Sequence, residues 1–235
     1  MTVRPSQAWR RPPKPRRVTQ RRPILALVVT LLVIPGGAPR SEPATRAAAE
    51  ASRTLDSLPW HPTEGTELFG KPAPPWEDIE WIQGGPLSLQ ALRGKVVLLR
   101  FWLTGCAYCT RTAPALNALW RKYRDRGLVV VGLHHPKSRH TRSEKIVREA
   151  ARELAFRFPV GMDNDWTTLD RYWTGEARRS FTSVTFLIGR DGRIRFLHDG
   201  GEFFPGEGEP GRAYVAMETM TERLLREPPV LKPSA

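Results

Sequence analysis

Two cysteines, placed where a predicted strand meets a predicted helix, constrain this chain more than any other feature. The run 95–103 (KVVLLRFWL) is continuous in apolar, β-branched and aromatic residues, which predicts a buried central strand. Cys106 and Cys109 follow directly, and from 106 to 126 alanine, leucine and tryptophan recur at helical spacing. The chain should therefore fold around a strand, a turn and a helix, with both sulfur atoms in the turn.

The position of this C-x-x-C pair at a helix start favours redox chemistry. The first turn of a helix has unpaired backbone N–H groups and the positive end of the helix dipole, which stabilise a thiolate and hence the nucleophilic form of cysteine. Two intervening residues bring the second sulfur round one helical turn, within bonding distance of the first. We therefore predict that Cys106 is the attacking thiol and Cys109 the resolving thiol. The chain has only these 2 cysteines, so a stapling disulfide framework is excluded.

The rest of the chain alternates predicted strands and helices. They are a strand at 128–133, a helix at 143–156, a strand at 158–162, a short helix at 166–173, a hairpin of 183–188 with 194–198, and a helix at 211–226. A small hairpin is also expected before the central strand. Alternating strands and helices imply parallel strands joined by crossovers, and the late hairpin adds antiparallel edges. The predicted fold class is α/β, with a mixed central sheet flanked by helices.

The formal net charge of +13 is concentrated at the amino terminus. Before Pro23 there are eight basic residues and no acidic one, which leaves 29 of the 37 basic residues against 24 acidic residues in the rest of the chain. This small excess of basic over acidic residues is typical of an ordinary solvated protein surface. We therefore predict no nucleic-acid partner.

The amino-terminal segment resembles an export signal. The basic stretch leads into the apolar run 24–34, which is shorter than the roughly 20 residues needed to cross a bilayer but fits the hydrophobic region of a signal peptide. We predict a signal peptide or signal anchor at 1–38, a linker at 39–64, one domain at 65–228 and a tail at 229–235. The domain would then lie in the periplasm or on the outer face of the cytoplasmic membrane, with 24–34 as its anchor if the signal is not cleaved.

Several motifs in a fixed order resemble the thioredoxin-like superfamily. They are GKPAPPW, LSLQALRGKVVLLRFW, the C-x-x-C, RGLVVVGLHHP, FPVGMDND, RYW and TFLIGRDGRIRFLHDGGE, and they are similar to the exported TlpA/ResA-type branch and to the thioredoxin-like part of DipZ-type proteins. The resemblance implies a thioredoxin fold and dithiol–disulfide exchange with protein thiols or disulfides outside the cytoplasm. It also implies an upstream thiol–disulfide donor and neither a metal nor an organic cofactor. The residues expected to contact substrate are Trp102, Ala107, Tyr108, Thr182 and Ser183.

Two positions depart from the family pattern. Ser183 occupies the place of the usual cis-proline, and because a cis bond before serine costs about 3–4 kcal/mol, we expect a trans bond there. Arg100 occupies the strand position at which thioredoxins carry a buried acid. If its guanidinium faces the cysteines, it should favour thiolate and stabilise the reduced form, which would make the pair more oxidising. If it extends to the surface instead, it should have no such effect.

Other interpretations of the motif remain open at this point. A metal-binding or copper-delivery module could use Cys106, Cys109 and a histidine such as His198, because soft thiolates suit Cu(I). A thiol peroxidase is disfavoured because Thr104 lies two residues before Cys106, where the peroxidatic motif requires three. The pair His134 and His135 follows a strand end and is expected to be merely polar.

Overall fold

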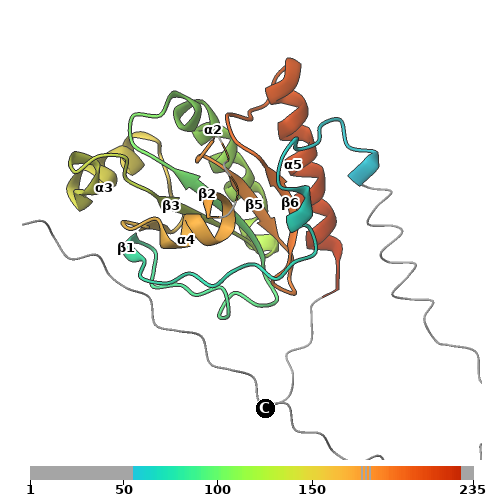
Figure 1. The fold of residues 1–235 in the computed structure, drawn as a ribbon. Coiled ribbons are helices and arrows are strands. Elements are labelled where there is room, and N and C mark those ends of the chain that lie inside the picture. Colours follow the sequence, from blue (N-terminus) through green and yellow to red (C-terminus); the bar gives the residue numbers. More distant parts are fainter. Residues whose placement is uncertain (1–54, 176, 178, 180, 229–235) are drawn as a thin grey trace, which may run out of the picture. The chain divides into compact units, whose positions relative to one another are not determined.

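A computed structural model describes residues 55–175, 177, 179 and 181–228, and every structural statement below concerns this part of the chain (Figure 1). The predicted signal segment at 1–38 and the tail at 229–235 lie outside the described residues. The strands are β1 (Glu80–Gln83), β2 (Val96–Trp102), β3 (Leu128–His134), β4 (Val160–Met162), β5 (Thr185–Ile188) and β6 (Ile194–His198). The helices are α2 (Ala107–Tyr123), α3 (Glu144–Glu153), α4 (Thr167–Leu169), its π-helical continuation η4 (Asp170–Thr174) and α5 (Gly208–Arg226), with 3₁₀ turns η1 (Thr66–Leu68), η2 (Arg124–Arg126) and η3 (His140–Arg142).

The strands form one mixed sheet in the order β1-β4-β3-β2-β5-β6. The central strand β2 is parallel to β3 and antiparallel to β5, while β5 and β6 form the predicted hairpin. This arrangement confirms the predicted α/β class and thioredoxin fold. Its consequence for the site is that the carboxyl end of β2 leads directly into the C-x-x-C turn and α2.

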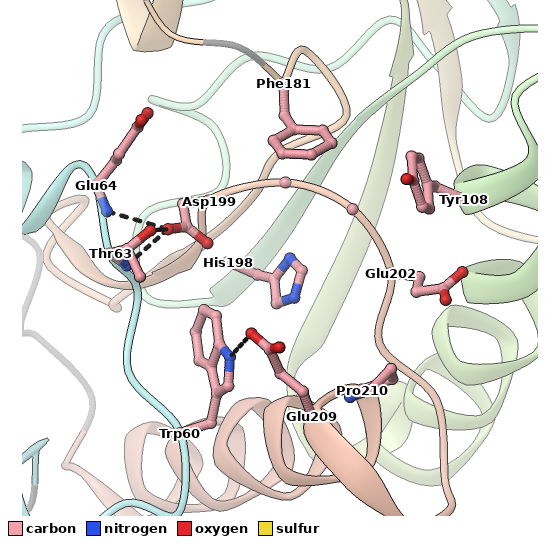
Figure 2. A pocket seen from close by; sticks show the side chains of 12 residues that line it. Trp60, Thr63, Glu64, Tyr108, Phe181, His198, Asp199, Glu202, Glu209 and Pro210 are labelled. Carbon is pink, nitrogen blue, oxygen red and sulfur yellow. Dashed lines mark hydrogen bonds between the residues drawn. The ribbon is translucent and has the colours of Figure 1, made fainter.

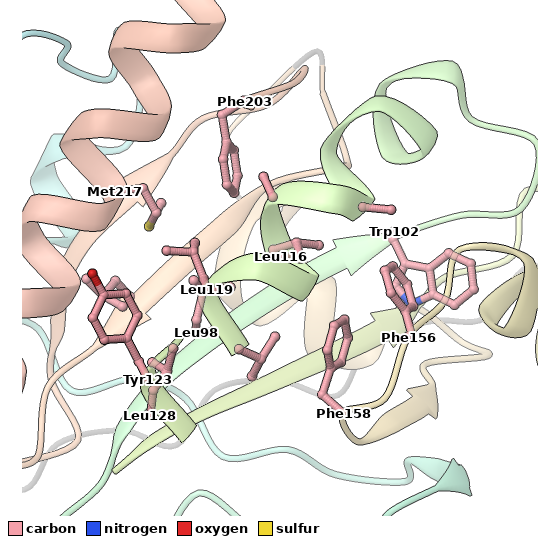
Figure 3. Packing of buried hydrophobic residues seen from close by; sticks show 14 of the residues in the cluster. Leu98, Trp102, Leu116, Leu119, Tyr123, Leu128, Phe156, Phe158, Phe203 and Met217 are labelled. Atoms are coloured by element: carbon pink, nitrogen blue, oxygen red, sulfur yellow. The ribbon is translucent and has the colours of Figure 1, made fainter. Parts of the chain in front are cut away.

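The core lies on both faces of the sheet, because all seven residues of β2 are buried. Side chains alternate along a strand, so Leu98 faces one cluster and Leu99 the other. The first cluster is covered by α2, α3 and α5, and Figure 3 shows Leu116 of α2 and Met217 of α5 packed over this face. The second is covered by α4, η4 and the segment before β1.

One expectation about the segment before β2 was wrong, and the packing of its first residues was not expected. The predicted small hairpin is absent from the described residues, because β1 pairs in antiparallel fashion with β4 at the sheet edge instead of with a neighbour in sequence. In addition, Leu58 and Trp60, which fall in the predicted linker 39–64, are buried in the first core cluster. The packed part of the chain therefore begins before residue 65.

Within the described residues, no helix combines the length and apolar character needed to span a membrane.

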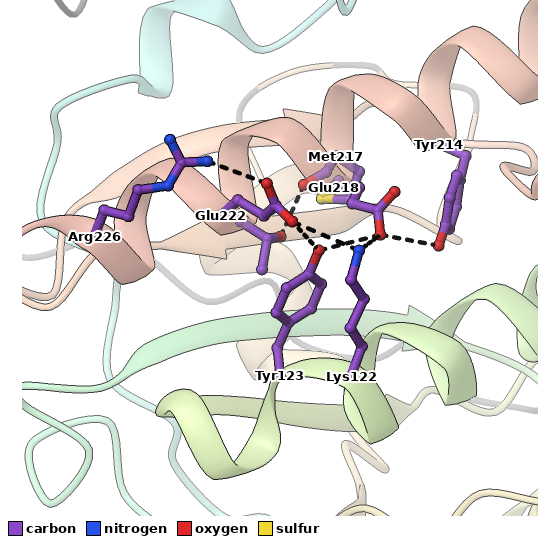
Figure 4. A network of polar contacts seen from close by, with 8 residues as sticks. Lys122, Tyr123, Tyr214, Met217, Glu218, Glu222 and Arg226 are labelled. Carbon is purple, nitrogen blue, oxygen red and sulfur yellow. Dashed lines mark hydrogen bonds and ion pairs between the residues drawn. The ribbon is translucent and has the colours of Figure 1, made fainter.

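A polar network joins the end of α2 to α5 (Figure 4). The Tyr123 hydroxyl lies 2.7 Å from Glu222 Oε1 and 3.1 Å from Glu218 Oε1. Lys122 Nζ donates a hydrogen bond to Glu218 Oε1 at 2.9 Å, and the Tyr214 hydroxyl lies 3.5 Å from the same oxygen. The network joins the carboxyl end of α2 to the last helix.

We expect Tyr123→Phe to lower the free energy of unfolding by about 1 kcal/mol, because it removes a short hydrogen bond to a carboxylate without changing the packed ring. Urea unfolding measures the change. Tyr214→Phe, which removes a contact of 3.5 Å in the same network, should cost clearly less. An equal decrease in the free energy of unfolding in the two variants would show that the short Tyr123 hydrogen bond contributes no more than the long Tyr214 contact.

Candidate active site

The cysteine pair lies at the first turn of α2, as predicted. Cys106 is the N-cap residue, and its Sγ accepts a hydrogen bond from the Cys109 backbone N–H at 3.3 Å. Both cysteines are free thiols in this structure; Cys106 is half-buried, whereas Cys109 is 2% exposed. The sulfur atom that solvent and a partner reach is therefore that of Cys106.

The two thiols have opposite acidities. The pKa of Cys106 is lowered from 9.0 to about 5, mainly because the Cys109 thiol donates a hydrogen bond to it, with further help from the Cys109 backbone N–H and the charge of Arg100. The pKa of Cys109 is raised above its ordinary value by that same hydrogen bond and by burial. At neutral pH the pair therefore holds a thiolate on the accessible sulfur and a proton on the buried one.

Arg100 faces the cysteines, so the first of the two predicted orientations is confirmed. It is 1% exposed, and its Nη2 lies 4.0 Å from Cys109 Sγ. Nη1 donates to Thr185 Oγ1 at 3.0 Å, and Nη2 donates to the Gly201 carbonyl at 3.1 Å. Among the described residues no carboxylate forms an ion pair with this guanidinium. The charge of this buried guanidinium instead favours the thiolate of Cys106.

Sequence reasoning missed the part played by His134 and His135. The Thr104 backbone N–H donates to His134 Nε2 at 3.2 Å, and His135 Nε2 lies 2.9 Å from Thr182 Oγ1. Burial lowers the pKa of His134 to about 4 and that of His135 to about 3, so both rings are neutral at pH 7. The two histidines therefore tie down the loops on either side of the cysteine turn. Their position at the carboxyl end of β3 was the signal available in the sequence.

The residues predicted to contact substrate divide into three groups. Ala107 and Tyr108 are exposed on the turn itself, and Tyr108 is 41% exposed. Thr182 is half-buried, and Ser183 is buried. Trp102 has no exposed surface, so the expectation that it contacts substrate is wrong. Its ring packs edge-on against neighbouring buried rings, at a centroid distance of 5.0 Å from His134 and 5.4 Å from Phe156.

The loop before β5 reaches the active-site turn, although Ser183 replaces the usual proline. The Phe101 backbone N–H donates to the Val184 carbonyl at 3.0 Å, which aligns this loop with the last residues of β2. The peptide bond before Ser183 is trans, because the only cis bond in the described residues is Gly85–Pro86. The loop is thus shaped here without the cis bond that the family pattern predicts.

A metal site has no ligand set in this region. The alternative drawn from the sequence required a histidine such as His198 to converge on Cys106 and Cys109. Within the described part of the chain, no three histidine, cysteine, aspartate or glutamate side chains come together in a way that could hold an ion. The geometry therefore gives the metal-binding alternative no support.

A cavity of about 350 Å³ adjoins the cysteine turn. Figure 2 shows its lining, which comes from Tyr108, from Phe181, from the loop at 198–202, from the first turn of α5 and from the segment before η1. Its wall includes Trp60, which lay in the predicted linker. Nothing in the local sequence pattern indicated that these distant segments would meet.

The fold and the dithiol together define the class of protein: a thioredoxin-like protein with a redox-type cysteine pair at the start of a helix. The chain belongs to the AhpC/TSA family, whose model matches residues 69–197.

Three comparisons refine this placement. The chain is 32% identical over 142 residues to Protein DipZ from Mycobacterium bovis, a match that covers 60% of this chain and 18% of DipZ. It is 30% identical over 126 residues to the thiol-disulfide oxidoreductase ResA from Bacillus cereus, covering 54% of this chain and 66% of ResA. The crystal structure of a thiol-disulfide isomerase from Corynebacterium glutamicum superposes with a TM-score of 0.54 at 25% identity, covering 66% of this chain and 98% of that one. The chain thus spans less than two thirds of the length of each of these two sequence relatives. Among the proteins it resembles are a thiol-disulfide oxidoreductase and a thiol-disulfide isomerase.

Proposed function

We propose that this chain exchanges disulfides with extracytoplasmic protein partners, with Cys106 as the nucleophile and Cys109 as the resolving thiol. The observation that carries the proposal is the division of the pair into an accessible sulfur, whose pKa is lowered to about 5, and a buried protonated one. Only a thiolate attacks a disulfide, and only an accessible one meets a protein-sized partner.

The proposed reaction runs in two balanced steps. The Cys106 thiolate attacks one sulfur of the partner disulfide, so that a mixed disulfide forms and the other partner sulfur leaves as a thiolate. Cys109 then loses its proton to the departing thiolate or to solvent and attacks Cys106 Sγ. The Cys106–Cys109 disulfide forms, the partner's second thiolate is released, and two electrons have passed to the partner. The charge of Arg100 eases the second step, because it favours the thiolate of Cys109.

The active-site surface proposed for substrate contact is formed by Ala107, Tyr108, Thr182 and the backbone at Ser183. The first two are exposed beside Cys106, and the last two belong to the loop that reaches the end of β2. The trans bond at Ser183 offers the partner a different backbone edge from that of a cis-proline loop.

The location of this activity rests on the amino-terminal sequence. A basic stretch followed by the apolar run 24–34 supports export, with cleavage or retention of that run as an anchor. We place the domain in the periplasm or on the outer face of the membrane, where an upstream dithiol–disulfide donor would restore the cysteine pair after each cycle. Fractionation of cells, with and without residues 1–38, checks this location.

Trapping tests the exchange reaction directly. With a peptide that contains one disulfide, Cys109→Ser should accumulate a covalent adduct of one peptide on Cys106, seen as a mass increase without reductant. It accumulates because the resolving thiol is missing. Cys106→Ser should form no adduct, since Cys109 is buried, and the double variant serves as the blank. A Cys109→Ser protein that is folded but forms no adduct with any disulfide peptide would refute the proposed function.

A further inference from the structure

The cavity beside the cysteine turn has an acidic wall, although the chain as a whole is basic. Glu64, Asp199, Glu202 and Glu209 all line it, and no lysine or arginine does. Glu202 is paired with Arg111 across the rim. Among the described residues, no ion pair neutralises the other three carboxylates. Three carboxylates without an ion-pair partner among the described residues therefore line a cavity whose wall also includes Tyr108, two residues beyond Cys106.

Part of this charge is held in place by hydrogen bonds. Asp199 Oδ2 accepts from the Thr63 backbone N–H at 2.6 Å and from the Glu64 backbone N–H at 3.0 Å, which fastens the segment before η1 to the loop after β6. Trp60 Nε1 donates to Glu209 Oε1 at 3.4 Å. Glu64 and Glu209 thus line the cavity from the segment before η1 and from the start of α5 (Figure 2).

A buried histidine with an unpaired nitrogen faces the same cavity. His198 lines the cavity and is 4% exposed, and Figure 2 shows its imidazole in the middle of the lining side chains. Its ring stacks on Trp60 at a centroid distance of 4.8 Å, and its Nδ1 has no hydrogen-bond partner among the described residues. Burial, aided by the charge of Arg100, lowers the pKa of His198 to about 3, so the ring is neutral at pH 7. A neutral imidazole has one acceptor nitrogen, which suits a ligand that donates hydrogen bonds.

Two exposed aromatic rings connect this cavity to Cys106. Tyr108 and Phe181 are 41% and 43% exposed, and their rings meet edge to face at a centroid distance of 5.9 Å. Tyr108 is only two residues beyond the nucleophile. The Arg111 guanidinium already lies over the Tyr108 ring, 5.2 Å from its centroid, so what these two rings offer a long side chain is contact with its apolar stem. A ligand in the cavity therefore lies next to the exchanging sulfur.

We propose that this cavity binds a lysine or arginine side chain of the partner protein, close in sequence to the partner cysteine that exchanges with Cys106. The proposal rests on the proposed function, because it names the partner of that same site. The carboxylates of Glu64 and Glu209 meet the cationic head, the imidazole of His198 accepts a hydrogen bond, and the stem lies against Tyr108 and Phe181. Partners with a basic residue at this distance are then selected over neutral or acidic ones.

Matched disulfide peptides test this specificity. The peptides differ only in carrying lysine, glutamine or glutamate at each position from two to five residues from the cysteine, and the second-order rate constant for exchange is measured for each. At the best position the lysine peptide should react about fivefold faster than the glutamine peptide at low salt, which is the size expected of a partly exposed ion pair. The glutamate peptide should be slower still. High salt should shrink the difference, because it screens exposed charges.

Charge-removing variants locate the effect. Glu64→Gln combined with Glu209→Gln should bring the lysine-to-glutamine ratio close to one. Glu149→Gln combined with Glu153→Gln, on the exposed face of α3, removes the same charge elsewhere and should leave the ratio unchanged. Equal rates for all three peptides, or a preference that survives in the first variant, would overturn this inference while leaving the exchange function standing. No reaction with any peptide would instead refute the proposed function, and this inference with it.

Discussion

Alkylation of Cys106 by iodoacetamide is expected to follow an ionisation near pH 5 instead of near 9. The rate should be close to its plateau at pH 6 and fall about tenfold for each pH unit below 5, because only the thiolate reacts. At pH 6 an ordinary thiol of pKa 9.0 is about 0.1% ionised, so its reaction is roughly a thousandfold below its own plateau. A low-pKa thiolate is less nucleophilic, and this offsets part of the advantage. The shape of the pH profile, more than its height, is therefore the diagnostic result.

The measurement is a pH series of alkylation rates on the reduced protein, with the modified residue identified by mass. Cys109 should stay unmodified throughout, because it is buried and its pKa is raised. In Cys109→Ala the profile should move to higher pH, since the largest contribution to the low pKa is the hydrogen bond from the Cys109 thiol, which alanine cannot donate. A profile centred above pH 8 in the unmodified chain would show that the turn does not stabilise a thiolate.

The same shift makes the stability of the reduced protein depend on pH. The pKa of Cys106 is lower in the folded chain than the value of 9.0 expected when the chain is unfolded. Its contribution to stability is therefore fully present above pH 9 and is lost as the pH falls towards 5. The oxidised protein has no thiolate and lacks this contribution.

Replacing Arg100 by methionine is expected to shift the redox equilibrium with glutathione about tenfold towards the disulfide. The sulfur 4.0 Å from the Arg100 guanidinium is that of Cys109, which keeps its proton. For the Cys106 thiolate the charge of Arg100 is one of the smaller contributions to the low pKa, so we expect its loss to cost about one pKa unit, which is about 1.4 kcal/mol or tenfold. Loss of the charge should thus raise the pKa of Cys106 and destabilise the reduced form. The same substitution should stabilise the oxidised form. In that form the buried guanidinium has no thiolate to interact with and no carboxylate partner among the described residues. A tenfold shift corresponds to about 30 mV.

The control for this prediction is Arg100→Lys, which keeps the charge but loses the paired hydrogen bonds to Thr185 and Gly201. It should shift the equilibrium less than Arg100→Met does. Urea unfolding of the oxidised proteins separates the redox effect from loss of folding, since methionine fills much of the volume of the arginine stem. A folded Arg100→Met protein with an unchanged equilibrium constant would show that the guanidinium does not influence the cysteines.

The central part of the fold was predictable because its signals are local. The apolar run of β2, the turn that carries Cys106 and the spacing of apolar residues in α2 all lie within a short stretch of chain. The same holds for the β5–β6 hairpin, whose turn residues separate two apolar runs. The boundaries differ from the predicted ones by a few residues, as expected where helix ends fray.

Other features depend on contacts between residues far apart in the sequence, and the local sequence pattern did not predict them. Trp102 is predicted to contact substrate, but α2 and α3 cover that face of the sheet and leave it no exposed area. The segment with Trp60 was taken for linker because it is rich in proline and lacks periodicity. Its ring is nevertheless buried against Phe196 and His198.

The amino-acid sequence by itself determined that a dithiol stands at the start of a helix behind a buried strand, because strand and helix patterns and the C-x-x-C spacing are properties of neighbouring residues. Only the tertiary structure decided that Arg100 faces Cys109 and that His134 and His135 hold the flanking loops. It also decided that an acidic cavity forms beside Tyr108. These contacts join residues far apart in the chain, and such residues meet only when the sheet order and the helices that cover it are set.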